Sequence, residues 1–134
     1  MAKIIDVEGI GPEYTKKLVA AGITTTNKLL KKGTTPEGRK EIEMQTGIGH
    51  ALVLEWVNHV DLYRIKGVAQ EYSDLLEEAG VDTVPELAQR NGSNLYAKLA
   101  EVNNKKHLVR QLPSESQVAD WIAQAKKLPR VIQY

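Results

Sequence analysis

The sequence predicts an all-α protein with roughly eight to ten short helices. Apolar residues recur at helical spacing along almost the whole chain, as Leu52, Trp56, Val60 and Tyr63 do. Residues that begin or end helices, namely Ser, Thr, Pro and Gly, separate these stretches. Alternation of apolar and polar residues is confined to the short tail RVIQY, so no substantial sheet is expected.

The first half contains signals for a series of helices. The stretch EYTKKLVAAG predicts a helix that ends at Gly22. Thr25 can cap a short helix that stops near Gly33, and Thr35 with Pro36 begins the next, because proline suits the first helical position. The stretch GHALVLEWVNHVDLYRI then predicts a longer helix.

The same scheme returns in the second half. Thr83 and Glu86 predict a capping box, and Ser93 is expected to open a helix over NLYAKLAEV. Ser114 with Gln117 predicts another capping box ahead of QVADWIAQAKKL. Pro129 is expected to end that last helix.

An internal repeat underlies this organisation. VEGIGPEYTKKLVAAGITTTNKL matches IKGVAQEYSDLLEEAGVDTVPEL at 8 of 23 positions, Gly9/Gly67 and Tyr14/Tyr72 among them, and Trp56 aligns with Trp121. The repeat predicts two similar units, residues 1–62 and 63–134, packed as one compact domain around a shared core. Both tryptophans are expected in that core.

Composition limits the function classes. Eighteen Lys and Arg stand against 17 Asp and Glu, a net charge of +1. This balance argues against a dedicated nucleic-acid coat and a membrane-surface protein. Cysteine is absent, which excludes thiolate metal sites and disulfides. The start MAKIIDVEGI lacks the apolar core of a signal peptide, so a soluble, cytoplasmic protein without a membrane span is expected.

The turns between helices resemble the helix-hairpin-helix motif, in which glycine, an apolar residue and glycine join two helices. Gly9-Ile10-Gly11 and Gly47-Ile48-Gly49 carry this pattern. Two such turns per half resemble the double helix-hairpin-helix fold, which is similar to sterile-alpha-motif-like bundles. The whole chain resembles an uncharacterised bacterial domain-of-unknown-function family built from such repeats, on the stretches EGIGPEY, AAGITT, WVNHVDLYRIKGV, EYSDLLEEAGVDTVPELAQR and WIAQAKKLPRVIQY.

The resemblance implies contact with the nucleic-acid backbone without sequence preference. Glycines permit positive φ and leave backbone N–H groups uncovered at the next helix start, where a phosphate oxygen can bind. Such a contact positions a protein and reads no base. In the first turn, Gly9–Glu13, the acids Glu8 and Glu13 oppose a phosphate, so a purely structural turn is favoured.

The second turn, Gly47–Ala51, is the strongest candidate of the four. No acid follows it until Glu55, and His50 stands at the helix start. Arg39 and Lys40, one helix upstream, supply positive charge. Because a glycine–isoleucine–glycine turn also occurs as a plain corner, binding and structural interpretations both stay open here.

The other two turns depart from the motif. In the third, Gly67–Glu71, Lys66 can meet a phosphate, but Ala69 replaces the second glycine and Glu71 opposes binding. In the fourth, Leu112–Glu115, both glycines are absent and Ser114 caps its own helix. Upstream lies a basic cluster that is either a solvated face or a backbone-contacting patch: Lys105, Lys106, His107 and Arg110.

Two function classes follow, with a third kept for comparison. The first interpretation is a non-enzymatic helix-hairpin-helix module that makes weak, sequence-independent contacts to the DNA backbone. The alternative is a degenerate array that binds another protein, which the neutral charge and the acids beside three turns favour. The only sequence feature that favours an enzyme is the pair Glu55 and His59, which is expected on the surface of one helix. No metal, cofactor or small-molecule substrate is expected.

Overall fold

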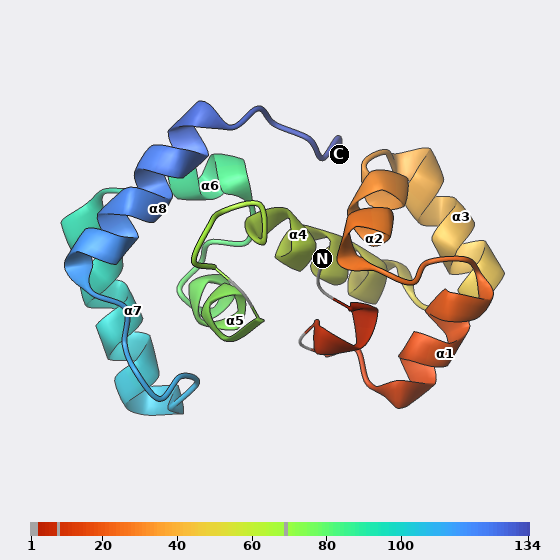
Figure 1. Ribbon diagram of the computed structural model, residues 1–134, viewed down its shortest axis with the longest axis horizontal. Coiled ribbons are helices and arrows are strands. Elements are labelled where there is room, and N and C mark those ends of the chain that lie inside the picture. Colours follow the sequence, from red (N-terminus) through yellow and green to blue (C-terminus); the bar gives the residue numbers. More distant parts are fainter. Residues whose placement is uncertain (1–2, 8, 69) are drawn as a thin grey trace. The chain divides into compact units, whose positions relative to one another are not determined.

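The computed structural model describes residues 3–7, 9–68 and 70–134 (Figure 1). Within these ranges no strand forms, and an isolated bridge joins Lys3 to Thr25. The predicted all-α class is confirmed. The described residues form a short 3-10 helix and eight α-helices: η1 Ile4–Asp6, α1 Pro12–Ala20, α2 Thr26–Gly33, α3 Pro36–Thr46, α4 His50–Leu62, α5 Gln70–Glu78, α6 Val84–Ala88, α7 Gly92–Lys106 and α8 Glu115–Lys127.

The chain divides into two compact units. The first comprises Met1–Asp61 together with Val131–Tyr134, and the second comprises Leu62–Arg130. The sequence predicts the tail within residues 63–134, but the structure places it in the first unit. The Gln133 backbone N–H donates to the Thr34 carbonyl at 2.8 Å, and Ile132 is buried. These contacts join the end of the chain to the region between α2 and α3.

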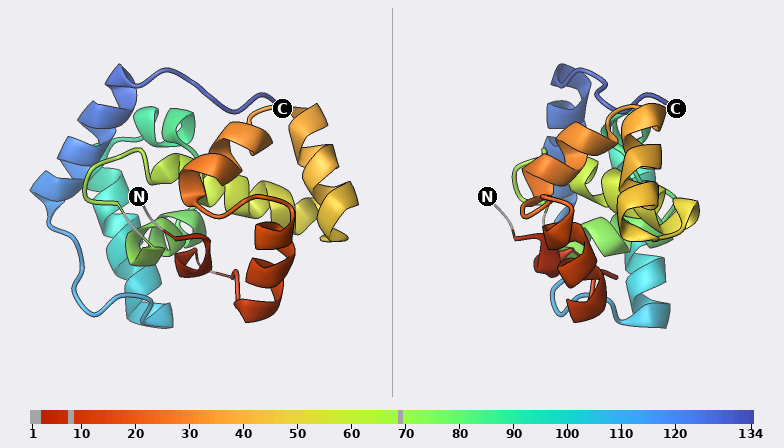
Figure 2. Two further views of the ribbon diagram at one scale, coloured as in Figure 1. Left: turned by 45° about the vertical axis from the view of Figure 1, so that its right-hand side comes forward. Right: turned by 90° about the vertical axis from the view of Figure 1, so that its right-hand side faces the viewer.

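In the first unit, α1 packs against η1 and α3, and α2 lies beside α3 (Figure 2). The corner between α2 and α3 is tight, because a Cβ on Gly38 would collide with the Lys32 carbonyl oxygen. Gly33 is also confined, against the side chain of Val57 in α4. The buried apolar side chains of this unit include Leu18, Leu29, Ile42, Ile48, Val53, Trp56 and Val60.

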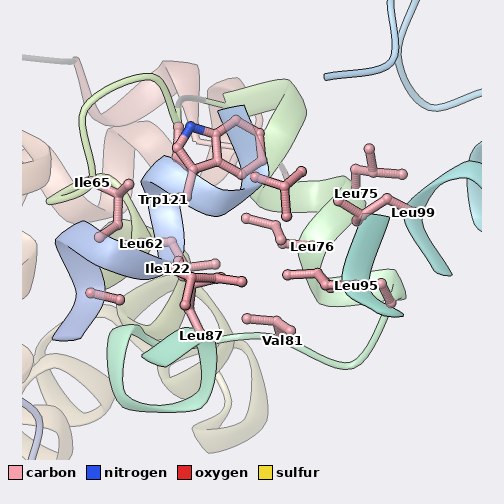
Figure 3. Packing of buried hydrophobic residues seen from close by; sticks show 14 of the residues in the cluster. Leu62, Ile65, Leu75, Leu76, Val81, Leu87, Leu95, Leu99, Trp121 and Ile122 are labelled. Atoms are coloured by element: carbon pink, nitrogen blue, oxygen red, sulfur yellow. The ribbon is translucent and has the colours of Figure 1, made fainter. Parts of the chain in front are cut away.

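The second unit has its own apolar cluster, which Figure 3 shows from close by. Leucines of α5 and α7 converge with Trp121 and Ile122 of α8 and with Leu87 of α6. α8 packs against both α6 and α7, and α5 packs against α7. Each of these helices therefore turns its apolar face into one core.

Side-chain caps begin four α-helices where the sequence places them, at Thr25, Thr35, Thr83 and Ser114. The Thr25 hydroxyl accepts from the Lys28 backbone N–H at 3.2 Å. Ser114 and Gln117 form the predicted capping box at α8. The α7 prediction is corrected: Asn91, not Ser93, caps this helix, because the Asn91 side chain accepts from the Asn94 N–H at 3.1 Å. The helix therefore starts two residues earlier than expected, and asparagine is as good an N-cap residue as serine.

Candidate nucleic-acid interface

The first glycine in each of three turns adopts a left-handed backbone. The φ angles are +89° at Gly9, +73° at Gly47 and +95° at Gly67. A Cβ at Gly9 would also lie 3.3 Å from Nε1 of Trp56, and one at Gly67 would lie 3.0 Å from Nε1 of Trp121. Both backbone conformation and packing therefore require glycine at these positions, independently of any ligand.

The second glycine of the first two turns is under no such requirement. Gly11 has φ −89° and ψ −175°, and Gly49 is not among the residues with positive φ. A Cβ at either position would meet nothing within 4 Å. Each glycine is the N-cap of its helix, since its carbonyl accepts from Thr15 at 2.9 Å or from Val53 at 3.2 Å. The expected use of positive φ thus applies to the first glycine alone.

An acid that the sequence analysis missed lies beside the second turn. Nδ1 of His50 is 3.0 Å from Oε2 of Glu43, a residue near the end of α3. One donor of the turn is also occupied, because the Ile48 N–H donates to the Thr46 hydroxyl at 3.2 Å. The only sequence signal was a Glu seven residues before His50, and this spacing brings the two together only because Gly47 reverses the chain.

Arg39 does not belong to the candidate interface. Its side chain is 3% exposed, and its guanidinium donates to the carbonyls of Gly33 and Gln133, each at 2.8 Å. The same group lies 5.7 Å from the ring centroid of Tyr134. The expected phosphate contact by Arg39 is therefore wrong: its donors bind the chain's own tail. Lys40, its neighbour, is exposed.

At the third turn, the Lys66 side chain is exposed, but the N–H and the carbonyl of its backbone are already hydrogen-bonded. Its N–H donates to Oε1 of Gln124 at 2.8 Å, and its carbonyl accepts from Nε2 of Gln124 at 3.1 Å. Glu71 is exposed at the start of α5. Ala69, like Glu8 of the first turn, lies outside the described residues.

The two lysines of the basic cluster ahead of the fourth turn lie in ion pairs. Lys105 lies 3.5 Å from Glu101, and Lys106 lies 3.0 Å from Glu78. Arg110 is exposed and pairs with no carboxylate among the described residues. The Ser114 capping box occupies two N–H groups at the start of α8, those of Ser114 and Gln117. This turn therefore offers a solvated surface on which the two lysines are paired.

Three of the remaining candidates, Trp56, Trp121 and His59, lie in the interior. Trp56 and Trp121 are 0% and 2% exposed, which confirms their predicted place in the core and leaves neither ring free to stack on a base. His59 is 2% exposed while Glu55 is exposed, so the expected surface pair is wrong. No group of three or more metal-ligating side chains forms within the described ranges.

The site residues predicted from sequence fall into both units. The turns at Gly9 and Gly47 belong to the first, and Lys66, Gly67, Lys105, Lys106 and Arg110 belong to the second. In the part of the chain that the structure describes, no helix has the length and apolarity needed to cross a membrane.

These features define an all-helical protein with two compact units, in each of which a glycine turn packs on a tryptophan. Over residues 8–128 the chain matches the family described as "Domain of unknown function (DUF4332)". The chain belongs to that family. No solved structure matches it.

Proposed function

We propose that the protein is a tandem helix-hairpin-helix module that contacts the DNA backbone weakly and without sequence preference, and that it is not an enzyme. The observation that carries the proposal is the pair Gly11 and Gly49. Neither backbone conformation nor packing requires glycine there, and both stand at helix starts. The absence of a capping side chain leaves helical N–H groups open to an oxygen of a phosphate group.

The recurrence of one arrangement in both units supports the tandem interpretation. Tyr14 packs against Trp56 beside Gly9, and Tyr72 packs against Trp121 beside Gly67. We infer two pseudo-equivalent, sterile-alpha-motif-like units. In the first unit both turns keep the second glycine; in the second unit neither does. We therefore assign the DNA contact chiefly to the first unit.

Fluorescence anisotropy with a labelled DNA duplex tests this function. We expect weak binding, equal for duplexes of unrelated sequence, because backbone contacts read no base. Added salt should reduce the affinity with a slope of log affinity against log salt of roughly −2 to −4, at about 0.9 per phosphate neutralised. Absence of any anisotropy change at low salt would overturn the proposal.

A protein-binding role is the second candidate, and one observation favours it. Met44 is 77% exposed, and Val19 and Ile5 are 47% and 44% exposed, all in the first unit. Exposed apolar side chains mark a protein-binding surface where they form one contiguous patch, so this candidate requires the three to be covered together by one partner. A chain that fails to bind DNA at low salt would direct attention to these three residues.

A further inference from the structure

A hollow of about 440 Å³ lies in the first unit, between the turn that follows α1 and the end of α3. Three lysines of α2 and one amide of α3 reach it. We call it the lysine hollow, and its lining is Ala21, Gly22, Ile23, Lys28, Lys31, Lys32 and Gln45. The Gly22 and Ile23 N–H groups already donate to Val19 and Leu18 carbonyls. The donors available to a ligand are therefore the side chains.

Two of the three lysines of the hollow carry charge that no described carboxylate neutralises. Lys32 pairs with Glu41 of α3. Among the described residues, no carboxylate pairs with Lys28 or Lys31, and α2 contains no acid. The Lys28 ammonium donates to the Thr24 hydroxyl at 3.0 Å, which satisfies one of its three donors.

Lys28 occupies a position that disfavours a cation. It is the third residue of α2, after the Thr25 cap, where the helix dipole is positive. Lys32 lies four residues further on the same face, so the two like charges repel. Lys31 and Lys32 suit the last turn of the helix, but helix stability does not explain Lys28.

The second unit provides an internal comparison. Its matching helix, α6, also follows a left-handed glycine and begins at a capping threonine, Thr83. There the repeat places Glu86, Gln89 and Arg90 where α2 has Lys28, Lys31 and Lys32. Glu86 lies 3.7 Å from Arg90, so this face neutralises itself. The lysines are thus a property of the first unit and not a requirement of the repeated structure.

We propose that the lysine hollow binds phosphate groups of the nucleic-acid backbone, an inference that rests on the proposed function and adds a second contact surface to it. Lys28 and Lys31 supply unpaired ammonium groups, and the Gln45 amide can donate to the same oxygens. Point charges of this kind bind phosphates without reading sequence. The lysines three and four residues apart in TNKLLKKG were the sequence signal for this face.

The double variant Lys28→Glu/Lys31→Gln tests the inference, because it copies the α6 face onto α2. Binding to a labelled duplex is measured by anisotropy across a salt series. We expect affinity at low salt to fall about tenfold or more, and the salt slope to become less negative by about 1.8, for two lost phosphate contacts. Thermal unfolding should show a melting temperature that holds or rises, since an acid in the first turn suits the dipole.

The control is Lys126→Glu/Lys127→Gln, which makes the same change in net charge on two exposed lysines of α8 that, like Lys28 and Lys31, pair with no carboxylate among the described residues. Its affinity and salt slope should stay close to those of the unchanged chain. If both double variants lose affinity equally, or if the α2 variant binds as before, the lysine hollow is not a contact surface and the proposed function stands without it. If the unchanged chain fails to bind duplex at low salt, both proposals are overturned together.

Discussion

Tyr14 packs against the edge of Trp56, with ring centroids 5.1 Å apart and ring planes at 61°. The Trp56 indole nitrogen in turn lies beneath Gly9, 3.3 Å from where a Cβ would stand. Tyr72, Trp121 and Gly67 repeat this contact in the second unit, with centroids 5.3 Å apart. In each unit an aromatic pair thus fixes the backbone of a turn just ahead of a helix.

The first prediction separates the two kinds of glycine. Gly67→Ala should lower the free energy of unfolding by at least about 1 kcal/mol, because alanine at φ +95° is strained and its Cβ would press on the indole of Trp121. Gly11→Ala should cost less than about 1 kcal/mol, because alanine is a poorer N-cap than glycine but, at the ordinary φ of −89°, lowers the conformational entropy of the unfolded chain. Urea denaturation measures both. Equal losses would contradict the assignment of strain to the first glycine alone.

The all-α fold class and the starts of several helices could be predicted from sequence, because apolar periodicity and capping residues are local signals. Thr25 and the Ser114–Gln117 box act within three residues of their own positions. The position of the tail could not be predicted, because it depends on Arg39 reaching Gln133, 94 residues away. Nothing in the pattern around Arg39 distinguishes a buried anchor from an exposed cation. The helix-hairpin-helix character of the two units stays a prediction.

The second prediction concerns this anchor. Arg39→Met keeps an apolar stem but leaves the buried Gly33 carbonyl without its donor, so we expect a loss of about 1–3 kcal/mol. A chain that ends at Arg130 should also be less stable, since it lacks buried Ile132. In a double-mutant cycle the two losses should be less than additive, because Arg39 and Gln133 share a hydrogen bond. Strict additivity in urea denaturation would show that Arg39 does not hold the tail.

The third prediction concerns the corner between α2 and α3. Alanine is the better helix former by about 1 kcal/mol, so helix propensity alone predicts that Gly38→Ala stabilises the chain. We expect the opposite, a loss of about 1–3 kcal/mol, because the new methyl group would collide with the Lys32 carbonyl. Gly92→Ala in α7 is the control, since its Cβ would only touch Ile122 at 3.9 Å, and it should be neutral or stabilising in thermal unfolding. If Gly38→Ala stabilises the chain, a Cβ at position 38 does not collide with the Lys32 carbonyl and the corner between α2 and α3 is not tight.

The candidate site was less predictable than the fold, for a physical reason. Sequence spacing locates glycine turns, but it does not say which charges face them after the chain reverses. Glu43 shows this, because it reaches His50 across the second turn. Lys105 and Lys106 show it as well, since their carboxylate partners lie on α7 and α5. Charge balance at a turn depends on these tertiary pairs.

The last prediction uses Glu43 to decide whether the second turn binds phosphate or only reverses the chain. Glu43→Gln removes a negative charge near the start of α4 and keeps the side-chain shape. If helical N–H groups at Gly49 bind phosphate, duplex affinity in the anisotropy assay should rise, because the repulsion is gone. His50→Glu should lower affinity, and it should also lower stability slightly, since it places a second carboxylate beside Glu43.

For Glu43→Gln and His50→Glu, the melting temperature and the duplex affinity report different effects. A phosphate-binding turn requires the affinity changes to have opposite signs, while thermal unfolding reports the loss of the His50–Glu43 pair in both variants. Glu55→Gln, an exposed acid one turn further along α4, is the control for net charge and should change affinity less than Glu43→Gln does. If affinity is the same in all three variants while melting temperatures shift, the second turn is a structural corner, and any DNA contact of the first unit runs through other residues.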